Sequence, residues 1–188
     1  MFPPVLVTAP AADPVSLEEA KRHLRVDHAE DNALIGGLIK AAVSHLDGWS
    51  GILGRCLVEQ TWRVEGWGWG WPWRLPFPDA RDPVVSYLPA GGGARVTVAA
   101  ADVLVHDAWL RPVPGWSSPA LWAGGAAPVR VEFKAGYGTA ADVPAAIKQA
   151  ILLMVGHWYA SREAVGPAMQ EVPLAVGALL APFRVIRP

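Results

Sequence analysis

Acidic and histidine side chains gather at one point of the sequence, where they could in principle bind a metal ion. The residues concerned are His23, Asp27, His28, Glu30 and Asp31. Their spacing matches no known set of metal ligands. Asp27 also precedes a helical pattern, where its carboxylate would cap the backbone N–H groups of the first turn. We therefore expect a solvated helix cap here and no metal site.

Residues for nucleophilic or acid–base catalysis are not grouped in any familiar pattern. Cys56 has no accompanying His and Asn, so we expect a buried thiol next to a strand. His45 and His106 lack a serine or cysteine in a nucleophile context, and His157 lies in an apolar stretch, where an interior histidine is commoner than a catalyst. No P-loop, paired-carboxylate or serine-nucleophile pattern occurs. The sequence predicts a protein that is not an enzyme and holds no cofactor.

One glycine-rich turn imitates a dinucleotide-binding fingerprint. A strand pattern over Val129–Ala135 is followed by Gly136-x-Gly138-x-x-Ala141 and then by a helix. The fingerprint requires the helix to begin at the glycines, so that its N-terminus meets the pyrophosphate. Pro144 fits the first helical position and places the helix start several residues later. We expect a strand-to-helix turn without a nucleotide.

Tryptophan is abundant, and five of the ten tryptophans lie between Trp62 and Trp73. The last four alternate with small residues: Trp67, Trp69, Trp71 and Trp73 with Gly68, Gly70 and Pro72. In an extended segment this alternation would place all four indoles on one side. Three interpretations are open: a platform that stacks on sugars or single-stranded bases, an aromatic surface buried in a subunit contact, or a loop folded onto its own domain.

The helices that would position these residues can be read from caps and periodicity. Ser16 and Glu19 form a capping box before a short helix over about 17–24. The same start signal at Asp27 precedes a second helix that runs to about 47–49. A long helix over about 144–162 is apolar around most of its circumference, so it must be covered on more than one side, by its own domain or by a neighbouring subunit. A short helix follows at about 174–180.

Between the helices the chain changes to short β segments. The period-2 alternation over Val129–Ala135 is the clearest strand, with one dry and one wet face. Four further strands separated by Pro- and Gly-rich turns are expected at Leu57–Val64, Val84–Leu88, Arg95–Val98 and Val103–His106. The order helix, helix, small sheet, long helix places a β-rich insertion at about 57–135.

Length and composition restrict the class of protein. The 188 residues are 52% hydrophobic and have a net charge of −1, which fits one domain with a proper core and no general electrostatic grip on nucleic acid. The first residues carry no positive region and are broken by prolines, so we expect no signal peptide. The apolar run at 150–156 is far shorter than the about 20 residues that span a bilayer. We expect a soluble protein without a membrane partner.

Four segments carry a resemblance to a known family. They are "PVSLEEAKRHLRVDHAEDNALIGGLIKAAVSHLDGWSG", "VEFKAGYG", "VPAAIKQAILLMVGHWYASRE" and "VPLAVGALLAPFRV". Together they resemble the head-to-tail connector (adaptor) family of long-tailed phages and of phage-derived gene transfer agents. The resemblance covers nearly the whole chain. The Trp-Gly repeat and the residues around 51–55 depart from the family pattern.

The resemblance implies a single α+β domain over 1–188, in which a small helical bundle carries an inserted β-rich region. It also implies a structural protein that forms a ring, usually twelvefold, between the portal and a stopper or tail-terminator protein, with DNA passing through the lumen without sequence-specific binding. Such a protein would be cytoplasmic during assembly and then part of the particle at the head–tail junction. The alternative function is a carbohydrate- or nucleic-acid-binding module that uses the aromatic row Trp62–Trp73.

The same resemblance suggests which residues make contacts. We expect the ring interface to include Ile147, Ile151, Trp158 and Tyr159 from the long helix and Trp67, Trp69, Trp71 and Trp73 from the insertion. The segment at about 173–188 would be a docking tail. Its residues alone fit a docking peptide and a frayed end equally well, and family analogy assigns portal docking to Phe183, Arg184, Val185, Ile186 and Arg187.

Overall fold

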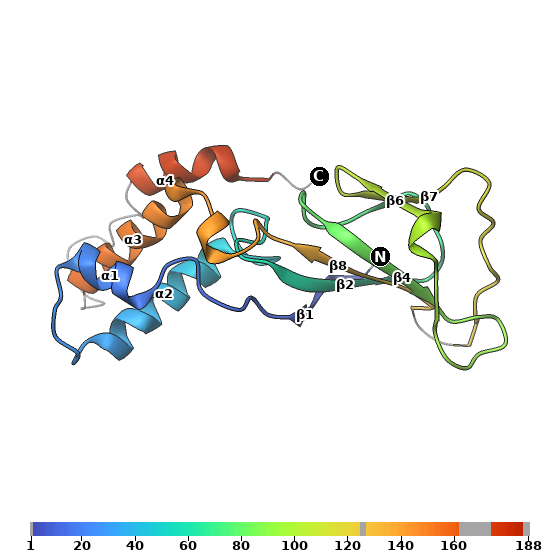
Figure 1. Ribbon diagram of the computed structural model, residues 1–188, viewed down its shortest axis with the longest axis horizontal. Coiled ribbons are helices and arrows are strands. Elements are labelled where there is room, and N and C mark those ends of the chain that lie inside the picture. The colour runs from blue at the N-terminus through green and yellow to red at the C-terminus, as the bar shows by residue number, and fades with distance from the viewer. Residues whose placement is uncertain (1, 125–126, 162–173, 186–188) are drawn as a thin grey trace. The chain divides into compact units, whose positions relative to one another are not determined.

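Helices and strands occupy separate stretches of this chain (Figure 1). The computed structural model describes residues 2–124, 127–161 and 174–185. The expected fold class, an α+β domain with a small helical bundle and an inserted β-rich region, is confirmed. Contacts group the residues into two compact units. The β unit comprises Met1–Pro10 and Glu59–Gly136, and the helical unit comprises Ala11–Val58 and Tyr137–Pro188.

The main sheet of the β unit is built on one long antiparallel pair. Strands β2 (Gln60–Gly66) and β8 (Val129–Ala135) pair over their whole length, from Gln60 opposite Ala135 to Gly66 opposite Val129. Burial alternates along both strands, so one face is dry and the other is wet, as the sequence predicted for β8. The full order is β1-β2-β8-β4-β5, in which the added strands are β1 (Val5–Thr8), β4 (Arg81–Tyr87) and β5 (Val96–Thr97).

A second, smaller sheet completes the β unit. Its order is β3-β7-β6, and the strands are β3 (Trp73–Arg74), β7 (Trp109–Pro112) and β6 (Val103–His106). On the dry face of the main sheet, Trp62 and Phe133 both contact the ring of Phe77, at centroid distances of 5.1 and 6.3 Å. Phe77 is fully buried, so these aromatic contacts form part of the core of the unit.

Charged side chains line the wet face of the main sheet in two groups. Glu65 accepts a hydrogen bond from Arg130 at 2.9 Å and lies 3.5 Å from Arg63. Glu59 contacts Arg81 at 2.7 Å and Lys134 at 3.3 Å, and hydrogen bonds from Arg81 and then Lys134 hold the pKa of Glu59 below its ordinary value. These ion pairs are partly exposed, so each contributes little stability on its own.

The helical unit contains α1 (Leu17–Leu24), α2 (Asn32–Leu46), α3 (Ala145–Ala160) and α4 (Leu174–Leu180). Helix α3 contacts α1, α2 and α4, which covers its apolar surface on several sides. The sequence left open whether this helix is covered by its own domain or by a neighbouring subunit. Most of the cover comes from helices of the same unit. The buried residues of α3 are Ile147, Ala150, Ile151, Met154 and Val155.

The observed bounds of α1 agree with those predicted from the sequence, whereas the start of α2 does not. The capping box at Ser16 and Glu19 is present, and α1 has the predicted bounds. Helix α2 begins at Asn32 rather than near Asp27, so the predicted start was wrong. Arg25 adopts a left-handed conformation with φ of 58° as it ends α1, and the chain then turns before α2 begins. His28 meanwhile pairs with Glu30 at 2.9 Å.

One predicted strand also begins later than the sequence indicated. Strand β2 was predicted over Leu57–Val64 but begins at Gln60. The N–H of Leu57 donates to the carboxylate of Asp47 at 2.6 Å, so it is used at the end of α2 and not in the sheet. The strands β1, β3 and β7 were not predicted from the sequence.

The buried Gly51 gives a test of packing in the helical unit. A Cβ at this position would lie 2.3 Å from the carbonyl oxygens of Leu46 and Asp47. We expect Gly51→Ala to lower the free energy of unfolding by roughly 1–3 kcal/mol. The matched control is Gly37→Ala in α2, where the added methyl meets open space and should raise stability by up to about 1 kcal/mol. Urea unfolding of both variants checks this, and equal effects would contradict it.

The capping box predicts a pH dependence. Glu19 accepts the Ser16 N–H at 2.7 Å, and this bond is the main reason that the pKa of Glu19 lies below its ordinary 4.5. Because the folded pKa is the lower one, the stabilisation is complete above pH 4.5 and is lost as the pH falls through the folded pKa. Glu19→Gln should therefore cost roughly 0.3–1 kcal/mol at pH 6, and this cost should shrink as the pH falls through the folded pKa of Glu19.

Thermal unfolding of wild type and variant across this pH range measures the difference. Glu18→Gln removes a negative charge from the same turn without touching the capping box, and it is the control. A Glu19→Gln effect that stays constant with pH, or that equals the control, would count against the capping role.

Candidate functional site

The tryptophan-rich segment between β2 and β3 folds into a stack of aromatic rings. Trp69 and Trp71 are nearly parallel, with centroids 5.9 Å apart and an interplanar angle of 17°, and Trp71 lies 6.0 Å from Trp73. Trp116, far along the chain, meets Trp69 and Trp71 edge-on at 5.1 and 6.2 Å. The indole N–H of Trp69 donates to the carbonyl of Pro119 at 2.8 Å. These contacts fold the segment onto its own unit.

The small residues of the segment have a steric role. A Cβ on Gly66 would lie 2.8 Å from the ring of Trp73, so a glycine is needed for the ring to approach the strand. Gly70 has a φ of 38°, which favours glycine, and the Trp71–Pro72 peptide is cis. Residues 67–72 do not form a strand. Trp69, Trp71 and Trp73 nevertheless follow one another in the stack, whereas the ring of Trp67 contacts Phe2.

Trp67 is the tryptophan of the four that leaves the stack. It is 65% exposed, and its ring contacts Phe2 at 5.4 Å. Trp73, at the other end, is buried. Of the predicted interface tryptophans, Trp67 therefore presents the most surface. Trp69 and Trp71 are partly buried in the stack.

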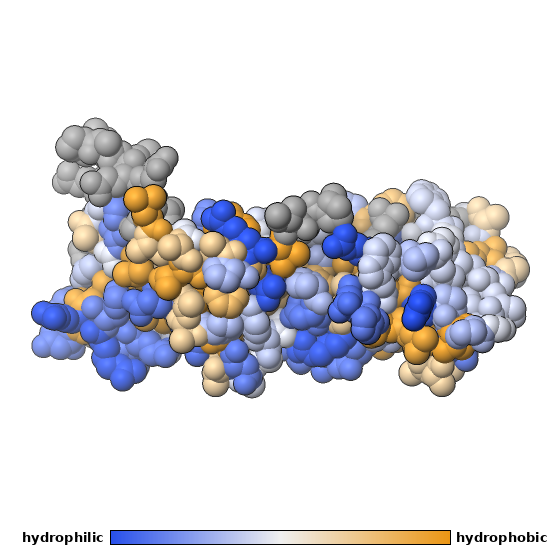
Figure 2. Space-filling model, turned by 90° about the horizontal axis from the view of Figure 1, so that it is seen from above, coloured by the Kyte–Doolittle hydropathy of each residue, from blue (hydrophilic) through white to orange (hydrophobic). Residues whose placement is uncertain are grey.

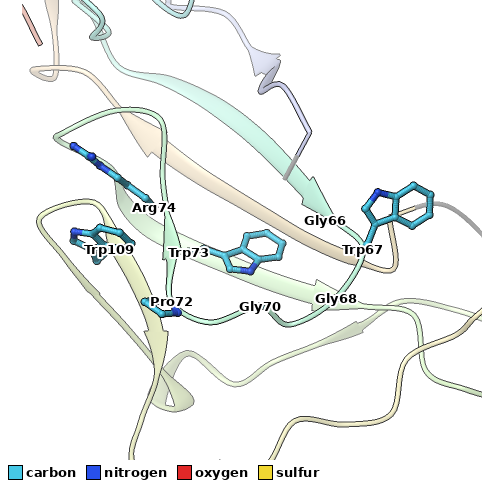
Figure 3. Close-up of a pocket in the computed structure, with 8 residues that line it drawn as sticks. All are labelled: Gly66, Trp67, Gly68, Gly70, Pro72, Trp73, Arg74 and Trp109. Atoms are coloured by element: carbon cyan, nitrogen blue, oxygen red, sulfur yellow. The ribbon is translucent and has the colours of Figure 1, made fainter. Parts of the chain in front are cut away.

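A cavity of about 530 Å³ opens beside Trp67 (Figure 3). Figure 3 shows the rings of Trp67 and Trp73 on one side and Trp109 on the other, with Arg74 next to Trp109. The guanidinium of Arg74 lies over the Trp109 ring at 5.8 Å, a cation–π contact. The lining residues are Gly66, Trp67, Gly68, Gly70, Pro72, Trp73, Arg74 and Trp109.

The chemistry of this cavity is that of apolar contact. Of its lining residues that the structure describes, Arg74 is charged and none is a carboxylate or an amide. Sugar recognition would need such groups for the hydroxyls, and catalysis would need an acid or a base. Trp67 is 65% exposed and Trp109 is 44% exposed, so both indoles present surface to solvent.

The predicted interface residues of α3 divide into two groups. Ile147 and Ile151 are fully buried in the helical core, where α3 meets the other helices of its unit. Trp158 and Tyr159 pack against that core but keep part of their surface, and the Tyr159 hydroxyl donates to the Asp31 carboxylate. A contact between subunits through α3 stays a prediction. It would depend on Trp158 and Tyr159, the two residues that keep part of their surface exposed. On the face seen in Figure 2, apolar residues interrupt hydrophilic surface over the helical unit, at the left.

The described part of the docking tail is held by its own unit. Phe183 packs against the helical core, and the Val185 N–H donates to the Leu53 carbonyl at 2.9 Å. Arg184 lines a second cavity of about 180 Å³, together with His45, Ile52, Val176, Gly177 and Leu180. The tail residues Ile186 and Arg187 lie outside the described residues. Its visible part is therefore ordered by contacts within the subunit.

Within the ranges that the structure describes, no three His, Cys, Asp or Glu side chains are grouped closely enough to hold a metal ion. Asp31 instead contacts Tyr159, and His28 pairs with Glu30. Cys56 is buried, as predicted. None of the helices in the described ranges combines the length and apolar character needed to span a bilayer.

Comparison with known proteins gives matches among solved structures. The first match is a chain from the neck of an empty gene transfer agent particle, reconstructed with sixfold symmetry. It has a TM-score of 0.76 and 23% identity, over 100% of this chain and 97% of that one. Our chain is similar to gene transfer agent neck chains. No model of a known protein family matches it, and no curated protein does.

Two further neighbours come from native gene transfer agent particles. One belongs to the virion, with a TM-score of 0.76, and one to a neck reconstructed with twelvefold symmetry, with a TM-score of 0.74. Each is 25% identical and is matched over 97% of its length by 100% of this chain. The resemblance to connector proteins of phage-like particles that the sequence motifs predicted is confirmed.

Three aromatic residues beside the Trp67–Trp73 segment were not predicted from the sequence. Phe2, Trp109 and Trp116 all contact the Trp67–Trp73 segment or line its cavity, but each is distant from it in sequence or lies in another strand. The run Val5–Thr8 is rich in β-branched residues, which favours a strand, but the flanking prolines hide this signal.

The close fit of Gly66 to Trp73 yields a prediction. Gly66→Ala should push the Trp73 ring out of place and lower the free energy of unfolding by roughly 1–3 kcal/mol. Gly68→Ala, two residues on, adds a methyl where nothing lies within 4 Å. Resonances of the indole N–H groups in NMR spectra should shift for several stacked tryptophans in the first variant and for few in the second. Similar spectra for both variants would contradict the stack as a packed unit.

Proposed function

We propose that this protein is a structural component of the neck of a phage-like particle, acting as a head-to-tail adaptor. The observation that carries the proposal is similarity over the full length of the chain, at TM-scores of 0.74–0.76, to chains of gene transfer agent particles. A match of this extent includes both the helical unit and the β unit. The proposed position is between the portal and a stopper or tail-terminator protein.

We further propose that copies of the chain form a ring of twelve. Similar chains belong to necks reconstructed with sixfold and twelvefold symmetry, which supports repeated copies around an axis. Exposed apolar side chains on the β unit, among them Trp67 and Trp109, offer lateral contacts. Trp158 and Tyr159 offer contacts on the helical unit. Ile147 and Ile151 would support such a ring by holding α3 in place.

The charge of the chain agrees with passage of DNA through the lumen without tight binding. A net charge of −1 provides no strong attraction for phosphates, so DNA would slide and not adhere. No base-specific recognition is proposed. The protein would assemble in the cytoplasm and then remain in the particle at the head–tail junction.

The structure sharpens the proposed role of the tail. Phe183 and Val185 make contacts that hold the segment to the helical unit. Their removal would disturb the fold as well as any docking. We therefore propose that portal docking depends chiefly on Ile186 and Arg187, with Arg184 exposed beside its cavity.

The alternative of a sugar- or nucleic-acid-binding module is less well supported. The rings of Trp69 and Trp71 stack on each other, and both make T-shaped contacts with Trp116. Stacking platforms need open ring faces and charged or amide partners for the ligand. The residues that line the cavity beside Trp67 include one charged side chain, Arg74, which lies over the Trp109 ring, and they include no carboxylate or amide side chain.

Electron microscopy with the portal protein of the same particle tests the adaptor role. The full chain should add a ring beneath the portal. A variant lacking Ile186 to Pro188 should stay folded, because the bond from Val185 to Leu53 is kept, and should lose portal binding. The matched control replaces Ile186, Arg187 and Pro188 with glycines and keeps the length.

The outcomes separate the parts of the proposal. If the full chain adds no ring, the adaptor role is wrong. If the shortened chain binds the portal as well as the full chain, only the assignment of docking to the tail is wrong. If the glycine variant binds normally, the side chains of these three residues are not what the portal recognises.

A further inference from the structure

Strand β1 forms one end of the main sheet, and its surface is unusual for such an end. In the sheet order β1 pairs with β2 on one side, and among the described residues no strand pairs with its other side. All four residues of β1 are exposed, and three are large aliphatics: Val5 at 49%, Leu6 at 43% and Val7 at 45%. The strand carries no charge. Natural sheets commonly place lysine or other charges on such edges to prevent pairing with another chain.

This edge continues into an exposed aromatic contact. Phe2, just before β1, is 36% exposed and contacts the ring of Trp67, which borders the cavity. At this end of the sheet the exposed apolar side chains are Phe2, Val5, Leu6, Val7 and Trp67, and together they form one group along the edge. We call it the β1 ridge. Apolar side chains exposed together at a sheet edge mark a surface that can pair with another chain.

The length of the edge is restricted on both sides. Pro3, Pro4 and Pro10 have no N–H to donate, and the pairing register shifts between Leu6 and Thr8. An added strand can therefore bond to only a short stretch of β1. These features favour one defined strand and not open-ended sheet growth.

We propose that the β1 ridge accepts a strand from a second copy of this chain, so that the sheet continues from one subunit into the next. This inference rests on the proposed function, since a ring arranges copies about an axis. A rotational ring needs two different surfaces on each subunit, one for each neighbour. The sheet has two unlike ends, β1 and β5, and β5 also exposes an aliphatic residue, Val96 at 42%.

The chemistry of the ridge favours protein over DNA as its partner. Residues 2–8 contain no lysine or arginine, so they offer nothing to phosphate groups. Backbone groups at a sheet edge bond a strand of any sequence, and the aliphatic and aromatic side chains around them select an apolar one. The Trp67 ring extends this apolar surface beyond the end of the strand.

Amide hydrogen exchange distinguishes strand addition from simple burial, because it reports on backbone bonds. The protein is compared as a dispersed subunit and as a ring, formed alone or on the portal. We expect exchange at Val5–Thr8 to slow by at least about tenfold in the ring. Strand β4, already paired with β5 and β8, is the internal reference and should not change.

The second experiment places positive charge on the edge strand β1. The double variant Val5→Lys with Val7→Lys should weaken ring formation by at least about tenfold, measured by native mass spectrometry. The matched control is Val84→Lys, because Val84 is similarly exposed at 52% but lies on an interior strand. Thermal unfolding of each subunit establishes that the variants are folded.

Each outcome decides the proposal. Rings whose β1 amides exchange as fast as in the subunit overturn this inference and leave the adaptor role standing. If rings form without the portal but their β1 amides become protected only when the portal binds, the choice of a second copy as partner is overturned. A chain that forms no ring in either setting overturns both this inference and the proposed function.

Discussion

The pairing of β2 with β8 is the interaction on which the β unit depends. These strands are far apart in the sequence, yet they pair without a shift from Gln60 and Ala135 to Gly66 and Val129. A shift by one residue would turn every dry position to the wet face. Because Trp62 and Phe133 share the dry face, this register brings both rings against Phe77. Strand β1 is added to one side of the pair and β4 to the other.

The helical unit obeys a different constraint, which is the need to cover α3. A helix that is apolar almost all round cannot remain with one face in water. Helices α1, α2 and α4 cover it, and Ile147 and Ile151 are therefore buried in the core of the unit. The surface of the helical unit that is left for other chains is consequently smaller than the sequence suggested. The β unit, where Trp67, Trp109 and the β1 ridge are exposed, offers apolar surface for the proposed contacts between subunits.

Local signals in the sequence predicted local structure well. Ser16 and Glu19 specify the start of α1, and the alternation in Val129–Ala135 specifies β8, because in each case the deciding partners are only a few residues apart. The predictions failed where partners are distant. Trp69 and Trp71 are ordered by Trp116, and β1 exists because β2 lies beside it, which no short window of sequence can reveal. The start of α2 was missed because a left-handed Arg25 carries no distinct sequence signature.

The distribution of tryptophans has a practical consequence. The helical unit contains Trp49 and Trp158, whereas the other eight tryptophans belong to the β unit. Intrinsic fluorescence is thus dominated by the β unit, and far-ultraviolet circular dichroism is dominated by the helices of the other unit. The two signals, recorded during one denaturant titration, report whether the units unfold in one step or separately. No extrinsic label is required for this comparison.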